Sequence, residues 1–404
     1  MNILIIGTTD IVGGAARVSW DLKESLEKNG HSVSMFVADK KSTDPNVFVI
    51  PRPKWRKILG FLLATENLIS TDWILKTKQF LEADIVHCHN LHGRFFNLKT
   101  LQKMSLLKPL IWTLHDAWAI TPHCAHTFES EMMKYGLLAC PSINIPPRTL
   151  WDNDKNLAEE KIKTYNNSRL HIVVPCRWLK DRVEKTVLKN QDLRLIPNGV
   201  DTAIFHPQDK MAARMDLGLP KDKKIVLFLA DDARKNTWKG WIYTEKVIEY
   251  FKDREDLLFM SVGNYSKVED EKNVRNIGRI NDKRTLAKYY AAADVLLFTS
   301  IAETFPLVTL ESMACGLPVV SFDVGGVKEA IQNNENGYIA KYKDVGDLIA
   351  GLNWFLNLND EQKKNISETS SQKTQKLYND SLMIDRYLNL YQELISANLH
   401  NGNN

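Results

Sequence analysis

The strongest constraint on the fold is an alternation of short apolar runs with amphipathic stretches of helical length, which occurs twice along the chain. Each apolar run is long enough for one buried strand, and each intervening stretch is long enough for a helix. A repeated order of strand, helix and strand is typical of parallel sheets that helices cover on both faces. The expected strands are residues 2–6, 32–38, 84–88, 109–114 and 170–174 in the first half, and residues 224–230, 257–262, 274–277, 295–299 and 318–322 in the second.

Residues 196–201, with the sequence Ile-Pro-Asn-Gly-Val-Asp, separate the two halves. Pro-Asn-Gly interrupts regular structure and favours a turn that tolerates positive φ. A chain of 404 residues also fits two domains of ordinary size better than one. We therefore predict an α/β protein with two doubly wound domains, residues 1–198 and 199–379. A helix near residues 380–397 can pack back on the first domain, and residues 398–404 are expected to form a disordered tail.

Composition narrows the class of protein. Hydrophobic residues make up 44% of the chain and charged residues 25%, which is typical of a soluble globular protein. No apolar run approaches the ~20 residues that span a bilayer, and the apolar start of the chain is too short for a secretory signal. The five cysteines are scattered and odd in number, which favours reduced thiols. We expect a cytoplasmic protein.

The net charge of +4 is unevenly distributed. Residues 1–198 hold 27 Lys and Arg against 20 Asp and Glu, whereas the remaining residues hold 26 against 29. The basic first half suits an anionic partner such as a phosphate or a membrane surface, but its excess is too small to indicate nucleic acid.

Residues 51–80 hold six Lys and Arg against two Asp and Glu, and they include a basic amphipathic helix at residues 53–62. This helix either packs on the core or docks on the anionic inner face of the cytoplasmic membrane. Its apolar face consists of Trp55, Ile58, Leu59 and Leu62.

The most informative stretch is residues 303–318. Thr304 can cap a helix, and Pro306 fits a first helical turn. Glu303 then lies in the loop before the helix, and Glu311 lies inside the helix.

A helix start after a parallel strand is a place where anions bind, because free backbone N–H groups and the positive end of the helix dipole point there. A diphosphate at this helix start would have Glu303 beside its sugar, and Glu311 could accept hydrogen bonds from ribose hydroxyls. Both glutamates could also be helix and surface residues without a role. The residues that would bind the diphosphate are Thr304, Phe305, Pro306 and Leu307.

Two cations, Arg234 and Lys239, follow the first strand expected in the second half and open a helix. A bound diphosphate carries negative charge, which a metal ion or fixed cations must neutralise. Arginine offers phosphate oxygens a planar fork and lysine a point charge. Lys235 is a rival for Lys239. Residues 152–154 have the Asp-x-Asp form of metal-dependent transferases, but we favour a helix cap there.

Polar residues also follow the strands expected in the first half. Residues 7–17 are glycine-rich but lack the G-x-G-x-x-G spacing, so a dinucleotide site is only weakly indicated. His87 and His89 share one strand face, and a metal pair there competes with buried structural histidines. A long loop, residues 117–147, is interpreted as shaping an acceptor site. It holds three candidate zinc ligands, one fewer than a structural site needs, at Cys124, His126 and Cys140.

The Glu-x7-Glu spacing from Glu303 to Glu311, with Gly-Leu-Pro-Val-Val at residues 316–320, resembles the signature of glycosyltransferase family four. Residues 196–207 resemble the interdomain segment of that family, and residues 323–337 resemble its closing portion. Members of the family have the GT-B fold, in which two Rossmann-like domains face each other across a cleft. The resemblance therefore implies a GT-B fold for this chain.

The resemblance also implies roles for individual residues. An Arg and a Lys clamp the donor diphosphate in the family, so that neither a metal nor another cofactor is expected. A glycine-rich loop approaches the donor phosphate and the acceptor, and a His-Asp segment meets the transferred sugar. The implied residues are His115, Arg234, Lys239 and Glu303 for catalysis, Gly14, Thr304, Phe305, Pro306, Leu307 and Glu311 for donor binding, and Gly13, His89 and Asp116 on the acceptor side.

We therefore expect a retaining glycosyltransferase, a hexosyltransferase that moves a sugar from a nucleotide-diphosphate donor to a glycan or lipid-linked oligosaccharide in surface-polysaccharide synthesis. The sequence places no covalent nucleophile, which favours a front-face mechanism. One alternative is a GT-B-fold nucleotide-sugar epimerase, which consumes no acceptor. Another is a non-catalytic glycan-assembly module, which binds nucleotide without turnover.

Overall fold

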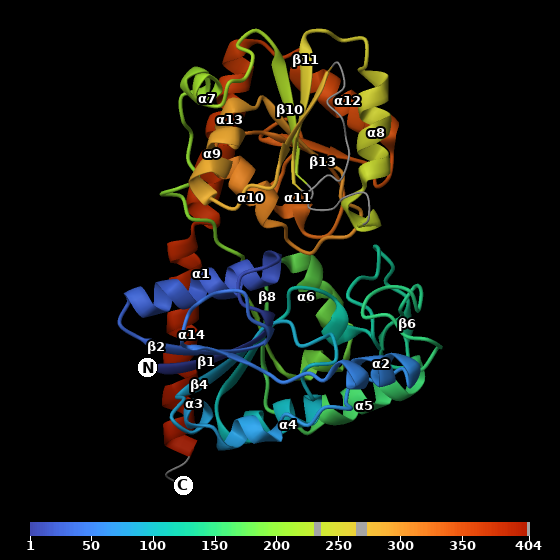
Figure 1. Cartoon of the computed structure of the whole chain (residues 1–404), viewed down its shortest axis with the longest axis vertical. Helices are drawn as coiled ribbons and strands as arrows, with labels where there is room; N and C mark the ends of the chain where they lie inside the picture. Colours follow the sequence, from blue (N-terminus) through green and yellow to red (C-terminus); the bar gives the residue numbers. More distant parts are fainter. Residues whose placement is uncertain (230–235, 264–272, 402–404) are drawn as a thin grey trace. The chain divides into compact units, whose positions relative to one another are not determined.

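A computed structural model describes residues 1–229, 236–263 and 273–401 of the chain (Figure 1). The chain divides into two compact units, one formed by Met1–Pro197 with Met383–Asn404 and the other by Asn198–Leu382. A parallel sheet with helices on both faces lies at the centre of each unit. The prediction of two doubly wound α/β domains is therefore confirmed.

The sheet of the first unit has the strand order β3-β2-β1-β4-β5-β8-β9 within the described residues, and every neighbouring pair is parallel. The order reverses between β1 and β4, which is the position where sheets of this type bind ligands. Apolar runs form the buried strands, because Leu4, Ile5 and Ile6 are fully covered. The strands are β1 (Asn2–Thr9), β2 (Ser32–Asp39), β3 (Val47–Val49), β4 (Ile85–Cys88), β5 (Leu110–Thr113), β8 (His171–Val174) and β9 (Asp192–Leu195).

Helices cover both faces of this sheet, with α1 on one side and α4 and α5 on the other (Figure 1). In α1 the buried residues Val18, Leu22 and Leu26 recur at helical spacing and face the sheet. The helices are α1 (Gly14–Lys28), α2 (Lys54–Leu62), α3 (Lys78–Leu81), α4 (Leu98–Leu107), α5 (Asp154–Asn166) and α6 (Arg177–Val183), with short 3-10 turns η1 (Asp72–Lys76), η2 (Trp118–Ile120) and η3 (Val187–Asn190).

The last helix of the chain, α14 (Asp380–Asn401), also packs on the first unit. The hydroxyl of Tyr391 lies 2.7 Å from Nδ1 of His87 on β4, and that of Tyr387 lies 2.9 Å from Oγ1 of Thr113 on β5. The helix extends past residue 397 to Asn401, so the predicted tail was too long. Neither glycine nor proline occurs in this stretch before Gly402, and nothing local stops the helix earlier. Residues 402–404 lie outside the described residues.

The sheet of the second unit has the order β12-β11-β10-β13-β14-β15 in the described part of the chain, again with parallel neighbours. It reverses between β10 and β13. Helices α8 and α12 pack on one face, with Val247 and Leu352 in the core, and α9 and α10 lie on the other (Figure 1). The strands are β10 (Lys224–Leu229), β11 (Leu257–Val262), β12 (Val274–Gly278), β13 (Val295–Phe298), β14 (Val319–Phe322) and β15 (Gly337–Ala340). The helices are α7 (Lys210–Asp216), α8 (Trp241–Tyr250), α9 (Lys283–Ala292), α10 (Leu307–Ala314), α11 (Val327–Ala330), α12 (Val345–Leu356) and α13 (Asp360–Leu377), with the 3-10 turn η4 (Thr237–Lys239).

Several strands were not predicted. β3 is only three residues long, and β9 is partly exposed along its whole length with the charged residues Asp192 and Arg194 in it. β15 and the two-stranded hairpin β6 (Met133–Lys134) and β7 (Leu137–Leu138) were missed as well. Edge strands do not need an apolar run, because one side of them stays open to water.

The amphipathic helix of the basic segment is α2, and its apolar face is at the surface. Trp55 and Ile58 are each 60% exposed, and Leu62 is exposed as well. Of the two interpretations of this helix, packing on the core is therefore wrong. No helix in the described residues is both long enough and apolar enough to cross a bilayer.

Candidate functional site

The residues predicted for function follow the carboxyl ends of the central strands in both sheets. In the first unit, the glycine pair follows β1, His89 follows β4 and His115 follows β5. In the second unit, Lys239 follows β10 and Glu303 follows β13. Each group therefore lies at the end of a sheet where the strand order reverses, which is the usual ligand-binding position of such sheets.

Lys239 and Glu303 are brought together in the second unit. Nζ of Lys239 donates to Oε1 of Glu303 at 2.6 Å, and their side chains are 34% and 14% exposed. The two loops that carry them are joined by a backbone hydrogen bond of 2.8 Å from the N–H of Ile301 to the carbonyl of Trp238. The pair is accessible enough for a ligand to contact its charges.

Gly240, directly after Lys239, allows this close approach of the loops. Its φ is +70°, and a Cβ placed on it would lie 1.8 Å from the carbonyl oxygen of Thr299. Another residue would therefore push the two loops apart and move Lys239 away from Glu303.

Two segments, the Pro-Asn-Gly sequence between the halves and the glycine pair of residues 325–326, hold the loop of residues 303–306. Asn198, from the Pro-Asn-Gly sequence, donates its side-chain amide to the carbonyl of Phe305 at 3.1 Å. The N–H of Gly326 donates to the carbonyl of Thr304 at 2.7 Å, and Gly325 has a φ of +56° and no room for a Cβ beside Glu303. Both segments therefore fix the backbone that carries Glu303.

The start of α10 differs from the prediction. Pro306 is the N-cap and Leu307 is the first helical residue, so Thr304 does not cap the helix. The hydrogen bond that Gly326 makes to the Thr304 carbonyl keeps the backbone before Pro306 outside the helix. The N–H groups free for an anion are consequently those that begin at Leu307.

Glu311 is buried inside α10, at 2% exposure. The hydroxyl of Tyr290, on α9, donates to its Oε2 at 2.9 Å. A buried carboxylate needs such partners, and the tyrosine also fixes the direction of the side chain. Sequence reasoning missed Tyr290, because only the packing of α9 against α10 brings it near Glu311.

Arg234, the second predicted cation, lies outside the described residues. Its rival Lys235 lies outside them as well.

In the first unit, three histidines form a stacked group, in which His87 on β4 and His89 directly after it are buried and His115 after β5 is half-buried. Nδ1 of His89 lies 2.8 Å from Nε2 of His115, and their rings are 5.2 Å apart and nearly parallel. His87 uses both ring nitrogens within the fold, toward Tyr391 and Thr113, each at 2.7 Å. No metal pair of His87 and His89 is indicated, since His87 is fully committed to side chains of the protein.

Burial keeps these histidines neutral. It lowers the pKa of His115 to about 4, although the nearby Asp116 acts in the opposite direction. It also lowers the pKa of His87 to about 3 and that of His89 well below its usual range. At neutral pH, His115 can therefore exchange hydrogen bonds with a ligand without carrying charge.

Asp116 pairs with His92, whose Nε2 lies 3.0 Å from its Oδ2. Burial opposes both charges, yet the ion pair raises the pKa of His92 and lowers that of Asp116. The other oxygen of Asp116 accepts from the N–H of Trp118 at 2.9 Å. Asp116 therefore anchors the loop after β5, and the role of His92 in this was not predicted.

Gly13 and Gly14 begin α1. Gly13 has a φ of +100°, both glycines are exposed, and a Cβ on either would meet no described atom within 4 Å. The buried carboxylate of Asp10 supports this loop by accepting from the N–H groups of Lys41 and Ser42 at 2.7–3.0 Å. The start of α1 is thus open for a ligand to approach the backbone.

The cysteine-containing loop is arranged differently from the prediction. Cys140 lies with His123 and Asp154, and among the described residues His126 is not part of this group. The N-cap of α5 is Asn153, which makes no side-chain capping hydrogen bond, and Asp152 before it accepts from the N–H of Asp154 at 3.0 Å.

Two family models match the chain. One, described as glycosyl transferases group 1, matches residues 209–373, and the other, described as Glycosyltransferase Family 4, matches residues 12–204. The chain belongs to glycosyltransferase family 4. The predicted family and the prediction of a glycosyltransferase are therefore confirmed.

This family 4 glycosyltransferase is 27% identical to WcaC of Escherichia coli (strain K12), named as a putative colanic acid biosynthesis glycosyl transferase, over 98% of this chain and 100% of WcaC. Its structure is similar to that of sucrose-phosphate synthase from Thermosynechococcus elongatus, with a TM-score of 0.69 and 19% identity over 98% of this chain and 100% of the other. It is also similar to Anabaena HepE in complex with UDP-glucose, with a TM-score of 0.69 and 15% identity over 97% and 99% of the two chains. These likenesses show the fold of GT-B glycosyltransferases.

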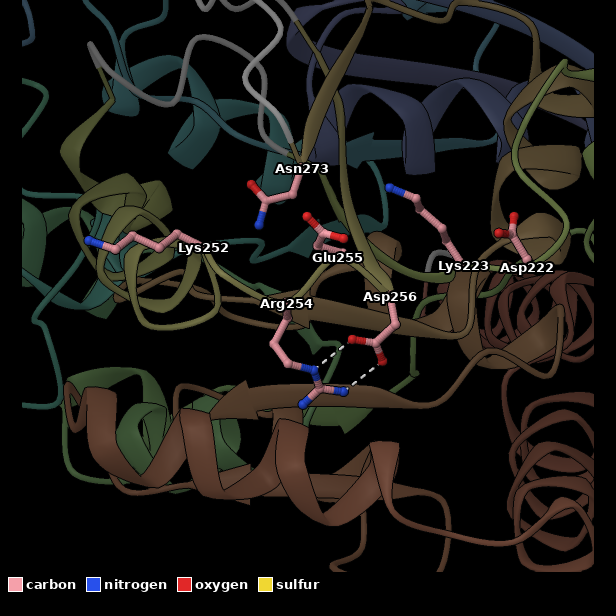
Figure 2. A pocket seen from close by; sticks show the side chains of 7 residues that line it. All are labelled: Asp222, Lys223, Lys252, Arg254, Glu255, Asp256 and Asn273. Carbon is pink, nitrogen blue, oxygen red and sulfur yellow. Dashed lines mark hydrogen bonds and ion pairs between the residues drawn. The ribbon is translucent and has the colours of Figure 1, made fainter.

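One surface pocket of the glycosyltransferase lies away from these residues (Figure 2). It has a volume of about 500 Å³, and its lining comes from segments that precede β10, β11 and β12. Arg254 and Asp256 there form a doubly hydrogen-bonded pair at 2.6 and 2.7 Å. The pocket is at the amino ends of the strands, opposite to the edge where sheets of this type bind ligands, so we do not assign the donor to it.

Proposed function

We propose that this glycosyltransferase moves a sugar from a nucleoside-diphosphate sugar to a glycan or lipid-linked acceptor in surface-polysaccharide synthesis, with retention of configuration and without a catalytic metal. The observation that carries this proposal is the Lys239–Glu303 pair at the carboxyl edge of the second sheet, directly before the free N–H groups of α10. The similar protein HepE forms a complex with UDP-glucose, and the name of WcaC refers to colanic acid biosynthesis, which supports the donor class and the pathway class.

Lys239 and Arg234 are proposed to neutralise the diphosphate. In the structure, Lys239 is held by Glu303. A bound donor places its phosphate oxygens near the ammonium group of Lys239 and its sugar near the carboxylate of Glu303. Lys239 then stabilises the leaving diphosphate, and Glu303 orients the sugar. As the glycosidic C–O bond to the phosphate breaks, an acceptor oxygen bonds to the anomeric carbon on the same face. A phosphate oxygen takes the acceptor proton, so that no protein nucleophile is needed.

Glu311 is proposed to bind the ribose, and the first unit to present the acceptor. Tyr290 donates to one oxygen of Glu311 and fixes the direction of the carboxylate, which we propose as an acceptor for a ribose hydroxyl. Neutral His115 is suited to a sugar hydroxyl, which carries no charge. Gly13 and Gly14 leave the start of α1 uncovered.

The first experiment identifies the donor. The purified protein is screened by thermal shift against UDP, GDP and ADP, because a ligand at ~100 times its Kd stabilises by roughly 2.7 kcal/mol. The matching nucleotide-sugars are then incubated with lipid extract, and nucleoside diphosphate release is measured with and without acceptor. Acceptor-dependent release supports transfer. Epimerised nucleotide-sugar without acceptor would favour the epimerase, and binding without release would favour a non-catalytic module.

A second experiment separates the two glutamates. Glu311→Ala should weaken binding of the bare nucleoside diphosphate, whereas Glu303→Ala should leave it unchanged and lower kcat. Wild-type nucleotide affinity in both variants would contradict the assignment.

Metal independence is tested with protein passed over a chelating resin. Activity should not rise when Mg²⁺ or Mn²⁺ is added, because the cations of the protein already neutralise the leaving group. Full dependence on either ion would disprove this part of the proposal.

We further propose that α2 docks the protein on the anionic inner face of the cytoplasmic membrane, where a lipid-linked acceptor is available. Its exposed apolar residues continue onto the neighbouring segment, since the indole N–H of Trp151 donates to the carbonyl of Leu62 at 3.1 Å and Trp151 is itself exposed. Cations flank this surface, and each is worth ~1 kcal/mol near anionic lipid. The exposed apolar residues are Trp55, Ile58, Leu62, Leu63, Leu150 and Trp151.

Liposome co-sedimentation tests the docking. Wild type should pellet with anionic vesicles and less with neutral ones, and added salt should weaken the binding. Reversal of Lys54, Arg56 and Lys57 to Glu should abolish it, whereas the matched reversal of the exposed residues Lys246, Lys364 and Lys376 in the second unit should not. Equal pelleting of the two variants would leave a soluble acceptor as the better proposal.

A further inference from the structure

A group of potential metal ligands lies in the first unit, between the long loop after β5 and the first turn of α5. His123 and Cys140 come from the loop, and Asp154 is the first residue of the helix. One ligand atom from each residue lies within 4.8 Å of the others. Nδ1 of His123 is 2.8 Å from Oδ1 of Asp154. The three donor atoms are therefore close enough to share one ion.

Hydrogen bonds within the protein satisfy only some of the polar atoms of this group. The side chains of His123 and Asp154 are 1% and 7% exposed. The second ring nitrogen of His123, Nε2, is buried and has no hydrogen-bond partner among the described residues. Buried polar atoms are nearly always bonded, and each one left without a partner costs free energy.

The chemistry of the donor set selects a particular ion. Imidazole nitrogen, thiolate sulfur and carboxylate oxygen are all ligands of Zn²⁺, and the thiolate disfavours Mg²⁺ and Ca²⁺. Lys161 is the nearby cation, and it donates to the backbone carbonyl of Thr121 at 2.9 Å. The ammonium group of Lys161 therefore bonds to the backbone of the loop.

Cys124 is a neighbour of Cys140, although its own sulfur is not one of the ligand atoms that lie within 4.8 Å of one another. The N–H of Cys124 donates to Sγ of Cys140 at 3.1 Å, so the two cysteines are in contact. Cys124 also follows His123 directly, and its carbonyl accepts from Thr121 at 2.6 Å, which fixes the backbone at this point. Structural zinc sites are closed by four protein ligands.

We propose that His123, Cys140 and Asp154, with Cys124 as the fourth ligand, bind a structural zinc ion. The ion has no part in the transfer reaction. It ties two points of the loop, 16 residues apart between Cys124 and Cys140, to the start of α5. Closing such loops removes conformational freedom from the unfolded chain. The same loop directly follows His115 and Asp116, so the zinc ion would hold in place the segment next to the residues that we propose to contact the acceptor.

The first test measures zinc in the full-length protein, purified without chelator and with a reductant. Wild type should hold about one zinc ion per chain, the stoichiometry of a single closed site. Cys140→Ser and His123→Ala should lose it. Cys315→Ser removes a thiol from the second unit and should retain the zinc. Because the ligand variants could fail to fold, wild type is also stripped of metal and titrated with Zn²⁺, which should raise its melting temperature.

Two results would overturn the proposal. Wild type without zinc whose melting temperature does not respond to added Zn²⁺ would show that the group is only hydrogen-bonded. A protein mass lower by two hydrogens, together with a non-reduced peptide map in which the Cys124 and Cys140 peptides are linked, would show a disulfide instead. The test is independent of the proposed function, because it measures metal content and stability rather than transfer.

Cobalt substitution tests the fourth ligand. Co²⁺ in a tetrahedral site absorbs in the visible range, and each thiolate adds charge-transfer intensity in the near ultraviolet. Cys124→Ser should keep the ion and lose about half of the charge-transfer intensity if two thiolates bind. Unchanged intensity in this variant would remove Cys124 from the site.

Discussion

The two sheets carry different chemistry at the same topological position. In the first unit, the polar groups after β4 and β5 are imidazoles that burial keeps neutral, with the pKa of His115 lowered to about 4. In the second unit, the groups after β10 and β13 are a lysine and a glutamate, which are charged and in contact at 2.6 Å. The topology fixes where ligands can bind, and the residue types at the strand ends set the chemistry of the groups there.

The difference matches the two halves of a transfer reaction. A nucleoside diphosphate brings negative charge, which the partly exposed Lys239 can meet without a large desolvation cost. Sugar hydroxyls are uncharged, and they can bond to buried neutral histidines. The predictions that follow test this contrast, beginning with the largest expected effect.

Replacing Lys239 should have the largest effect on turnover. Lys239→Ala removes a cation that stabilises the leaving diphosphate, and kcat should fall ~10²-fold or more. Steady-state kinetics with saturating donor provide the measurement. Lys246→Ala, an exposed lysine on α8, should retain wild-type activity. Similar activities for the two variants would mean that the second unit does not rely on this charge.

His115 should act as a neutral group at all pH values near neutrality. His115→Ala should lower kcat/KM roughly 10-fold, the scale of one lost hydrogen bond to substrate. Because the pKa of His115 is lowered to about 4, its titration should not affect the rate between pH 5.5 and 7.5. The pH profiles of kcat/KM for wild type and His115→Ala should therefore have the same shape in this range. A rate inflection of wild type that disappears in the variant would show that His115 titrates as an ordinary acid or base.

Tyr290 should have a smaller effect, which acts through Glu311. Tyr290→Phe removes the hydrogen bond that orients the carboxylate and should weaken nucleoside diphosphate binding about 3- to 10-fold. Calorimetry measures the affinity, and kcat at saturating donor should hardly change. Tyr250→Phe, at an exposed position on α8, provides the control. A larger loss in kcat than in affinity would indicate a role in the chemical step.

The last prediction concerns stability in acid. Burial lowers the pKa of His87 to about 3, whereas an unfolded histidine titrates near 6.5. Below pH ~6.5 the unfolded chain therefore binds more protons than the folded one, and stability falls as the pH drops toward 3. His87→Gln should make the melting temperature less dependent on pH between 6.5 and 4.5. His206 is exposed, and His206→Gln should keep the wild-type slope of melting temperature against pH. An equal slope in wild type and both variants would contradict the prediction.

The sequence predicted the strands and helices that rest on local pattern. Runs such as residues 257–262 need only apolar side chains to be recognised, and the structure has a strand with the same bounds. Residue types at strand ends also identified Lys239 and Glu303 as candidates. The prediction was wrong where tertiary bonds override local preference, as at Thr304, whose carbonyl is held by Gly326. Short edge strands such as β3 were missed, because few of their residues need to be buried.

The sequence by itself determined the family, the two doubly wound domains and the types of residue at the strand ends, because these depend on neighbours within a few positions along the chain. Only the tertiary structure decided which groups meet. His87 bonds to Tyr391 across 304 residues, Lys239 to Glu303 across 64, and His123 to Asp154 across 31. It also decided that the apolar face of α2 is exposed rather than buried. Contacts of this kind depend on how sheets and helices close on one another, and no local pattern contains that information.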